Sequence, residues 1–408
     1  MRRFGLAASA LAVLAACFAS DETVVDPFEP TVLPRIHLTE HARLGSGTGL
    51  TEHVLHRVSR AIVLSTGEIA LANINSEILV FGAQGDLRRT LGRKGSGPGE
   101  FQFLLDIVRL DDDRILTWDP ALSRVTVFDP DGRLDYVRTP QEVDLADVGG
   151  GFVGAFGDGS FVLEARPSWE SRQNAPDGLR SDTIPFLLFD SSGVLLRSIG
   201  HFIRRQRSYS ASSGYQRFLF DTSVQALLAN DELLVGENDS IVLMRFDSSG
   251  IARPRLELDR SPRRVTDLDI EAGWREWEAR QMVASGEMLK QAAMTLDRSA
   301  VEEMRARMRA SVEEALATAK ETIEPAEMLP AYKSIIVGSD GALWVEDYLS
   351  PTLGVSRWIL MSAGFSPIGR IELQPNERLL AAGPNNVIIL RTDELDVESV
   401  VILSRIQG

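Results

Sequence analysis

The stretch AIVLSTGEIALANINSEILVFGAQGDLRRTLGRKGSGPGEF, residues 61–101, decides the fold because it contains one complete repeating unit. Two apolar runs flank a polar turn, and a third run ends in Phe81 with Gly85 four residues later. Turns built on Gly, Asp and Asn between apolar runs are typical of β-hairpins. A fourth run, LRRTLGR, leads into a Gly-rich string that ends in Phe101. The stretch therefore predicts four antiparallel strands followed by a linker.

The first hairpin of this unit recurs along the chain. Its six copies are AIVLSTGEIAL (61–71), DIVRLDDDRIL (106–116), GAFGDGSFVL (154–163), ALLANDELLV (226–235), SIIVGSDGALWV (334–345) and LLAAGPNNVII (379–389). The residues that open the second strands lie 46, 46, 72, 110 and 45 positions apart: Gly67, Asp113, Gly159, Asp231, Gly341 and Asn386. A unit of about 46 residues with two insertions explains these intervals. Six four-stranded sheets can close into a ring without long exposed edges, so the sequence predicts an all-β, six-bladed β-propeller.

Closure of the ring needs a strand from the N-terminal side, because the last unit has only three strands before Gly408. The segment PRIHLTEHARL, residues 34–44, alternates roughly and is followed by Gly45-Ser46-Gly47, much as LRRTLGR is followed by Gly95-Ser96-Gly97. We expect this segment to be the outer strand of the sixth blade. Residues 34–408 would then form one cooperative domain.

The Phe-x-x-x-Gly turn and the string LGRKGSGPGEF resemble the NHL-repeat propellers, and the resemblance implies a six-bladed fold of the NHL or TolB-like type. Two further strings, Leu329-Pro330-Ala331-Tyr332 and Asp340-Gly341-Ala342-Leu343-Trp344-Val345, are similar to strings in six-bladed bacterial lipoproteins. The resemblance covers residues 34–408. It implies the fold and an envelope location, and it brings no catalytic motif.

The first residues are typical of a lipoprotein signal peptide. Arg2 and Arg3 precede an apolar stretch from Phe4 to Leu14, which is too short to span the membrane as a helix. Leu14-Ala15-Ala16-Cys17 looks like a lipobox and predicts a signal peptide over 1–16, lipidation of Cys17 and a flexible tether over 17–33. Ordinary cleavage after Ala16 or Ala19 is the alternative. Phe18 stands where the resemblance would place an inner-membrane retention Asp, which implies the outer membrane.

The net charge of −15 excludes some partners. An acidic surface repels nucleic acid backbones, and it lacks the basic clusters that bind anionic lipid. We therefore expect no nucleic acid partner, and we expect membrane attachment only through the lipid anchor.

Between the fourth and fifth units the pattern becomes helical, over 266–325. A stripe spaced by three and four residues predicts one helix: Val301, Met304, Met308, Val312, Leu316, Ala319 and Ile323. Ser299 and Glu302 form a capping box before it, and Pro325 ends it. An earlier segment, from about Ile270 to Ala293, predicts a second helix. The pair is either a lid or docking arm, or a hairpin packed on the face or rim of the propeller.

Polar residues follow the second strand of every unit. A propeller would array them around one face: Asn73, Asp119, Glu164, Glu237, Asp347 and Arg391. This ring predicts a mostly acidic ligand pocket for a sugar, a cationic peptide or Ca²⁺. The alternative is that each side chain caps its own turn.

Other candidate chemistry is sparse. His53 and His56, spaced i, i+3 before the first inner strand, could bind a divalent metal such as Zn²⁺, or they could belong to a loop. The string GRKGSGPG lacks the Lys-Ser/Thr ending of a phosphate loop and opens onto a strand, so it predicts a turn between blades. His201 and the arginines Arg204, Arg205 and Arg207 fall in a predicted loop, which would either be solvated or bind an anionic partner. A further loop is expected at 166–185.

These features favour a non-enzymatic binding or scaffold protein of the cell envelope that recognises a protein, peptide or glycan, with no cofactor. The competing class is a propeller hydrolase or lyase with a metal-dependent site on the axis. A third hypothesis is an envelope assembly factor that acts through the helical hairpin.

Overall fold

The structure is a computed structural model. It describes residues 28–29, 33–45, 55, 57–73, 77–143, 151–165, 178–210, 214–217, 219–220, 222–258, 260, 263–292, 297–349, 354–394 and 397–406. The predicted signal peptide and Cys17 lie outside these residues, as do His53 and His56.

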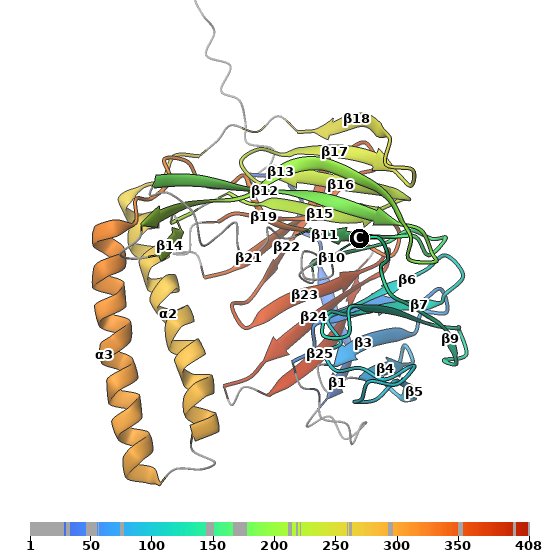
Figure 1. Cartoon of the computed structure of the whole chain (residues 1–408), viewed down its shortest axis with the longest axis horizontal. Coiled ribbons are helices and arrows are strands. Elements are labelled where there is room, and N and C mark those ends of the chain that lie inside the picture. Colours follow the sequence, from blue (N-terminus) through green and yellow to red (C-terminus); the bar gives the residue numbers. More distant parts are fainter. Residues whose placement is uncertain are drawn as a thin grey trace, which may run out of the picture.

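The described strands form six antiparallel sheets, which we number as blades 1 to 6 (Figure 1). Blade 1 consists of β2 (Arg60–Val63), β3 (Ile69–Asn73), β4 (Glu77–Phe81) and β5 (Leu87–Leu91). Blade 2 consists of β6 (Asp106–Arg109), β7 (Ile115–Asp119), β8 (Arg124–Phe128) and β9 (Leu134–Arg138). Blade 3 consists of β10 (Gly151–Ala155), β11 (Phe161–Glu164), β12 (Gly178–Phe189), β13 (Leu195–Ser210) and β14 (Gly214–Arg217).

The second half of the ring follows the same order from the axis outward. Blade 4 consists of β15 (Val224–Ala229), β16 (Glu232–Glu237), β17 (Val242–Asp247) and β18 (Ala252–Glu257). Blade 5 consists of β19 (Tyr332–Val337), β20 (Leu343–Asp347), β21 (Ser356–Met361) and β22 (Pro367–Leu373). Blade 6 consists of β23 (Glu377–Ala382), β24 (Asn386–Thr392), β25 (Glu398–Arg405) and β1 (Leu38–Gly45). The six-bladed propeller is thus confirmed.

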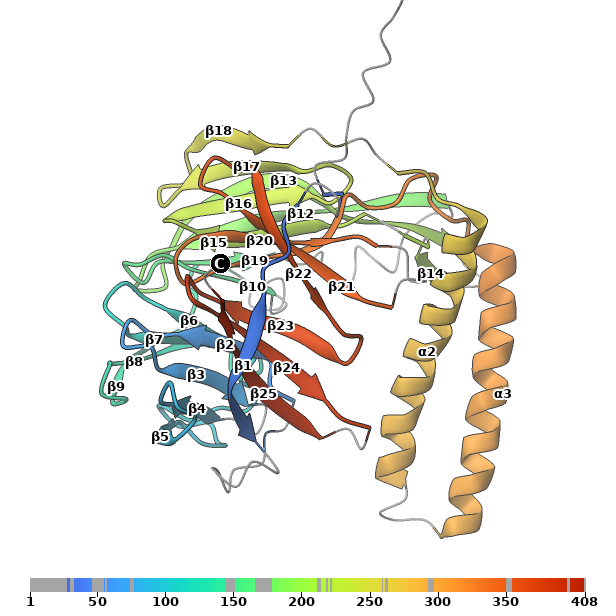
Figure 2. The ribbon, with the colours of Figure 1, turned by 180° about the vertical axis from the view of Figure 1, so that it is seen from behind.

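Ring closure by the N-terminal strand is also confirmed. β1 pairs with β25 in antiparallel register, from Leu38 opposite Arg405 to Gly45 opposite Ser399 (Figure 2). Leu44 of β1 is fully buried in a cluster that joins blades 6 and 1. The two ends of the chain therefore complete one sheet.

The turn residues explain why Gly, Asp and Asn open the second strands. Five of the six aligned positions have left-handed backbone, with φ of +81° at Gly67, +64° at Asp113, +88° at Gly159, +57° at Asp231 and +76° at Gly341. Glycine, and to a lesser degree Asp and Asn, adopt this conformation at low cost. Asn386 is the sixth position and does not adopt it.

The hydrophobic core is divided among the blade interfaces. Six buried clusters each join two neighbouring blades. Phe101, the last residue of the Gly-rich linker, is fully buried between blades 1 and 2, where its ring lies 6.2 Å from that of Phe128. Because each blade shares its core with both neighbours, no blade can bury its apolar side chains alone.

The predicted tether over 17–33 is wrong at its C-terminal end. Phe28 is fully buried and Leu33 is nearly so, both in the cluster between blades 4 and 5. The guanidinium of Arg260 lies 4.3 Å from the centre of the Phe28 ring. Residues 28 and 33 thus belong to the folded body.

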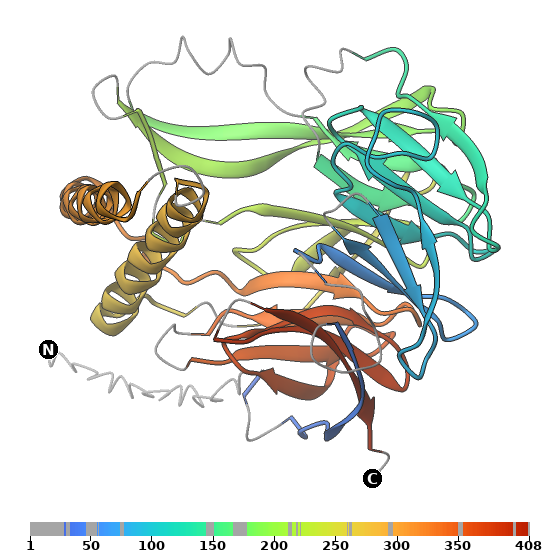
Figure 3. The ribbon, with the colours of Figure 1, turned by 90° about the horizontal axis from the view of Figure 1, so that it is seen from below.

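The helical insertion lies between β18 and β19, as predicted. It consists of α2 (Asp267–Ala292) and α3 (Arg298–Thr322), which Figure 3 shows at one side of the ring. Among the described residues, no helix combines the length and apolar character that a membrane span requires. The predicted capping box at Ser299 is wrong. Asp297 is the N-cap instead, since its carboxylate accepts a hydrogen bond from the amide of Ala300.

The base of the helical hairpin packs on the propeller. Trp274 of α2 and Ala319 of α3 join Leu219, Phe220 and Leu329 in a buried cluster. This agrees with the alternative of a hairpin packed against the rim, at least at its base.

Two predictions for blade 3 are wrong. Residues 178–185 belong to β12 rather than to a loop, and His201 with Arg204, Arg205 and Arg207 belongs to β13. β12 and β13 pair from Gly178 opposite Tyr209 to Phe189 opposite Leu195. The many charged residues concealed this pairing in the sequence.

Candidate functional site

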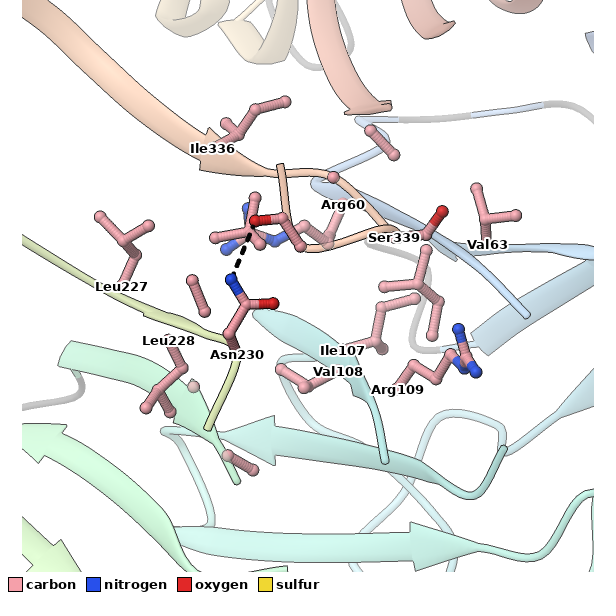
Figure 4. Close-up of a pocket in the computed structure, with 18 of the residues that line it drawn as sticks. Arg60, Val63, Ile107, Val108, Arg109, Leu227, Leu228, Asn230, Ile336 and Ser339 are labelled. Atoms are coloured by element: carbon pink, nitrogen blue, oxygen red, sulfur yellow. Dashed lines mark hydrogen bonds between the residues drawn. The ribbon is translucent and has the colours of Figure 1, made fainter. Parts of the chain in front are cut away.

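The candidate site is a cavity of about 460 Å³ on the axis of the propeller (Figure 4). All six inner strands line it: β2, β6, β10, β15, β19 and β23. A cavity of this size is within the range of ordinary ligand sites.

The walls of the cavity are mostly aliphatic. The branched side chains that line it are Ile62, Val63, Ile107, Val108, Leu110, Val153, Leu227, Leu228, Ile335, Ile336, Val337 and Leu380. Phe156 is the one aromatic residue among the described residues that line the cavity. The side chains along the axis are thus mostly aliphatic, while polar atoms also form a substantial part of the surface of the cavity.

The cavity reaches the turns between the first and second strands, and we call this end the hairpin mouth. Its lining there includes Asp111, Gly157, Asn230, Asp231 and Ser339. The side-chain amide of Asn230 donates to the carbonyl of Gly341 at 3.2 Å (Figure 4), and Asp231 accepts from the amide of Gly157 at 3.4 Å. These bonds join neighbouring blades around the mouth.

Two carboxylates at the hairpin mouth lack a basic partner. In the part of the chain that the structure describes, no Arg, Lys or His lies within ion-pair distance of Asp111 or Asp231. Arg109 also lines the cavity, but it is bonded to Asp113 at 2.7 Å. The mouth therefore carries uncompensated negative charge beside a channel lined mostly by aliphatic side chains.

Asp113 is part of the framework that holds this mouth. It accepts hydrogen bonds from the amide and the hydroxyl of Ser65 in blade 1 and pairs with Arg109 in its own blade. Burial acts to raise the pKa of Asp113, but the bonds from Ser65 and the charge of Arg109 outweigh it and lower that pKa. Asp113 is thus held charged.

At the opposite end of the inner strands, cationic groups join the blades. Arg60 makes two bonds to Asp106, at 2.8 and 2.9 Å, across blades 1 and 2. The charge of Asp106 raises the pKa of Arg60. Arg378 of blade 6 donates to the carbonyls of Val58 and Ser59 beside blade 1.

The second strands end on this opposite side, which we call the second-strand face. Each first strand runs antiparallel to its second strand, so the end of the second strand lies far from their common turn. The six residues predicted as a ring stand there, at or next to the last position of their strands. None of the six lines the axial cavity.

Each ring residue has an interaction with another part of the chain. Asp119 accepts from four backbone amides, those of Gln102, Phe103, Ala121 and Leu122. Asn73 donates to Glu77 at 3.3 Å, and Glu237 accepts from the amide of Ile203 at 3.1 Å. Arg391 bonds Glu377 and Glu40, and Glu164 is half-buried opposite Gly151. Of these contacts, those of Asp119 with Ala121 and Leu122 cap its own turn, whereas the partners of Glu237 and Arg391 come from other segments. Turn capping and ligand binding by the ring both stay predictions.

Asp347 has the most extensive partners in this ring. Its carboxylate lies 2.9 Å from Arg260, 3.4 Å from Arg357 and 3.6 Å from Arg263. The side chains of Asp347 and Arg260 are only 1% and 3% exposed, so this is a buried ion pair. Arg260 and Arg263 precede α2, and the cluster therefore ties the helical insertion to blade 5.

The Gly-rich string is a turn between blades, as predicted. It connects β5 to β6, and Arg124 donates to the backbone carbonyls of Ser96, Gly97 and Glu100. The Glu100 carboxylate accepts from the amide of Gly97 and from Arg93, and these bonds lower its pKa. The polar groups of the string are thus bonded to one another or to Arg124 of blade 2.

No metal-binding cluster of three or more His, Cys, Asp or Glu side chains occurs within the described ranges. His41 lies in β1, the outermost strand of blade 6, and His37 lies just before it, while His201 lies in β13, so these three histidines are not on the inner strands. The predicted pair His53 and His56 is outside the described residues, so that prediction stays open.

The axial cavity and its two carboxylates were not predicted from the sequence. Asp111 and Asp231 belong to turn strings, LDDDR and ANDEL, in which Asp is ordinary. In the sequence, these acids differ from the ring residues in one respect: they lie between the first and second strands of a blade, whereas the ring residues lie at the end of the second strand.

Neither a protein-family model nor a curated protein sequence matches the chain. Among solved structures, the chain is similar to a Bacteroides fragilis protein named for its presumed export, at 11% identity and a TM-score of 0.51, covering 91% of this chain and 96% of that one. Weaker likenesses include a DUF4221 family member from Bacteroides vulgatus (13% identity, TM-score 0.45, 91% and 98% covered). Another is virginiamycin B lyase from Staphylococcus aureus, at 9% identity and a TM-score of 0.40, covering 91% of this chain and 100% of that one. At these identities the comparisons show the propeller fold alone.

Proposed function

We propose that this chain is a non-enzymatic binding protein of the bacterial cell envelope, which recognises a peptide segment at the hairpin mouth. The observation that carries the proposal is the pair Asp111 and Asp231, two carboxylates without basic partners at the entrance of an aliphatic cavity. A basic side chain would compensate their charge, and an adjacent aliphatic side chain would enter the channel.

Two modest free-energy contributions would hold such a peptide. Burial of one Leu side chain contributes about 1.5–3 kcal/mol, and an ion pair at an exposed rim contributes about 0.2–1 kcal/mol. Neither term alone gives a specific ligand. Their combination favours peptides in which a Lys or Arg stands next to an aliphatic residue.

The lining favours a peptide over a glycan. Sugar sites are rich in aromatic rings, against which the sugar faces stack, and tryptophan is the ring preferred for such contacts. Among the described residues that line this cavity, the one aromatic ring belongs to Phe156, which is only 3% exposed. Glycan binding therefore becomes an outcome of the test rather than part of the proposal.

A titration of the full-length chain tests the proposal, with acetyl-Leu-Lys-Leu-amide as the probe and its Glu analogue as the charge control. We expect the Lys peptide to bind and the double variant Asp111→Asn/Asp231→Asn to bind it about tenfold more weakly, since two ion pairs are lost. Asp112→Asn is the matched control, because Asp112 is paired with Arg114 and does not line the cavity.

Equal binding of the Lys and Glu peptides, or no effect of the double variant, would contradict the proposal. Tight binding of maltotriose with no binding of either peptide would favour a glycan instead.

The envelope location rests on Cys17 and its lipobox. In cells, the protein should sediment with the outer membrane fraction, and Cys17→Ala should release it. Retention of the Cys17→Ala variant in the membrane would contradict lipid anchoring.

The hydrolase or lyase alternative has its own measurement. Metal analysis of the full-length chain would have to find one ion per molecule that is lost on replacement of His53 or His56. Without that result, nothing in the described residues favours it.

A further inference from the structure

A second cavity, of about 900 Å³, lies between α2 and blades 5 and 6. We call it the arm cleft. Its lining includes Arg275 and Glu276 from α2, Lys333 from β19, and Glu377 and Arg378 from β23. Figures 1 and 2 show α2 beside the end of β21, on the side of the ring away from β6 and β7. The arm cleft is thus separate from the hairpin mouth.

All four carboxylates that line the arm cleft already have partners. Glu346 accepts from the hydroxyls of Ser334 and Ser356 and pairs with Lys333 at 3.1 Å. Glu377 accepts from Arg391 and from the amide of Gln374. Asp347 is held by Arg260 and Arg357, and Glu276 also has a partner. Three of the four carboxylates in the arm cleft are therefore compensated by basic side chains.

Two arginines in the arm cleft have no carboxylate partner among the described residues. Arg275 is exposed on α2 and makes no ion pair there. Arg378 donates only to the backbone carbonyls of Val58 and Ser59, which uses two of its five N–H groups. In a chain with a net charge of −15, the arm cleft thus carries uncompensated positive charge.

The surroundings of Arg378 favour an anion. Burial lowers the pKa of Arg378, and the nearby charge of Arg60 lowers it further, against the opposite effect of Glu398. An anion bound at the guanidinium of Arg378 would stabilise its charged form and so raise its pKa again. Tyr348 lines the same space and is half-buried, whereas Trp358 is only 4% exposed and offers little surface to a ligand.

We propose that the arm cleft binds a small anionic ligand, a carboxylate or a phosphate monoester attached to an apolar group, with Arg275 and Arg378 on its oxygens. Guanidinium groups bind planar and tetrahedral oxyanions through paired N–H donors. Arg275 belongs to the helical hairpin and Arg378 to the junction of blades 6 and 1, and both line the arm cleft, so a ligand that reached both would connect these elements.

Calorimetric titration of the full-length chain with phenyl phosphate and with benzoate tests this proposal, and phenol is the neutral control. We expect at least one of the two anions to bind and phenol to bind much more weakly. Preference between the anions tells whether a phosphate or a carboxylate is the favoured group. Arg275→Gln should weaken binding about tenfold, because it removes charge-assisted hydrogen bonds from an exposed residue with no structural partner.

Arg309→Gln is the matched control, since Arg309 is exposed on α3 and does not line the arm cleft. Arg378→Gln should weaken binding at least as much as Arg275→Gln, but its bonds join blades 6 and 1, so its fold must be checked by circular dichroism. If Arg378→Gln unfolds, the proposal is tested by the anion affinity of Arg275→Gln alone. Absence of binding by both anions, equal binding of phenol, or unchanged binding by Arg275→Gln would overturn the proposal.

Discussion

The two ends of the propeller use acidic residues in different ways. On the second-strand face, Asp119 accepts from four backbone amides and Asp347 is surrounded by three arginines. At the hairpin mouth, Asp111 and Asp231 have no basic partner among the described residues. A carboxylate that accepts hydrogen bonds or pairs with arginines of the protein stabilises the fold. A carboxylate without such partners is free to bind a basic group of a ligand. Substitutions at the two ends should therefore separate stability from binding.

The largest expected effect is at Asp347. Asp347→Ala leaves the buried Arg260 without its carboxylate, and breaking a buried pair by removal of one partner costs about 3–5 kcal/mol. Urea unfolding followed by circular dichroism measures the loss. A loss of unfolding free energy below 1 kcal/mol would show that this ion pair contributes little to stability. It would contradict the proposed difference between the two ends.

The next effect is at Asp119, which holds the linker of blades 1 and 2 and its own turn. Asp119→Ala leaves four amides without their acceptor, and we expect a loss of about 2–3 kcal/mol, because some of these amides can turn to water. Asp231→Asn is the comparison at the mouth, because Asn tolerates the left-handed backbone there and only one bond of 3.4 Å is affected. Equal losses of unfolding free energy in the two variants would contradict the distinction.

A smaller effect concerns pH. The pKa of Asp113 is lower in the folded protein than its ordinary value of 3.8, so its stabilisation is present above that value and is lost as the pH falls through the folded pKa. Asp113→Asn should remove about 1 kcal/mol at neutral pH and flatten the loss of stability below about pH 4. Asn also tolerates the left-handed backbone at this position, so the variant changes charge rather than conformation.

Unfolding in urea between pH 2 and pH 7 measures this effect. If the variant and the parent lose stability in parallel below pH 4, Asp113 does not hold the mouth in the way described.

The smallest effect on stability is expected at the hairpin mouth. Asp111→Asn/Asp231→Asn should change the unfolding free energy by less than about 0.5 kcal/mol, because exposed residues without strong partners contribute little. The same variant should show the largest loss of peptide binding. Destabilisation by 2 kcal/mol or more would show that these carboxylates are structural after all.

The propeller could be predicted from the sequence because its information is local and repeated. An aligned turn residue marks each hairpin, as Gly67, Asp113 and Gly159 do in the first three blades. The left-handed backbone at these positions explains why Gly or Asp occurs there. Closure through β1 followed from counting strands. The helix start at Asp297 was missed, since Asp297 and Ser299 are both good caps and only the backbone decides between them.

The site could be predicted only in part, because partner identity depends on residues that are distant in sequence. The arginines around Asp347 come from positions 260, 263 and 357. Among the three aspartates of LDDDR, Asp112 and Asp113 have arginine partners, while Asp111 lines the cavity. No local pattern distinguishes these three side chains, so the open carboxylates became visible only in the structure.

Hydrogen–deuterium exchange of the full-length chain, with and without saturating acetyl-Leu-Lys-Leu-amide, most directly tests whether the hairpin mouth is the binding end. We predict added protection of the turns at 109–115, 155–161 and 229–232, and none in the residues that follow the second strands. Protection around Asp119 and Asp347 without protection of those turns would contradict this assignment.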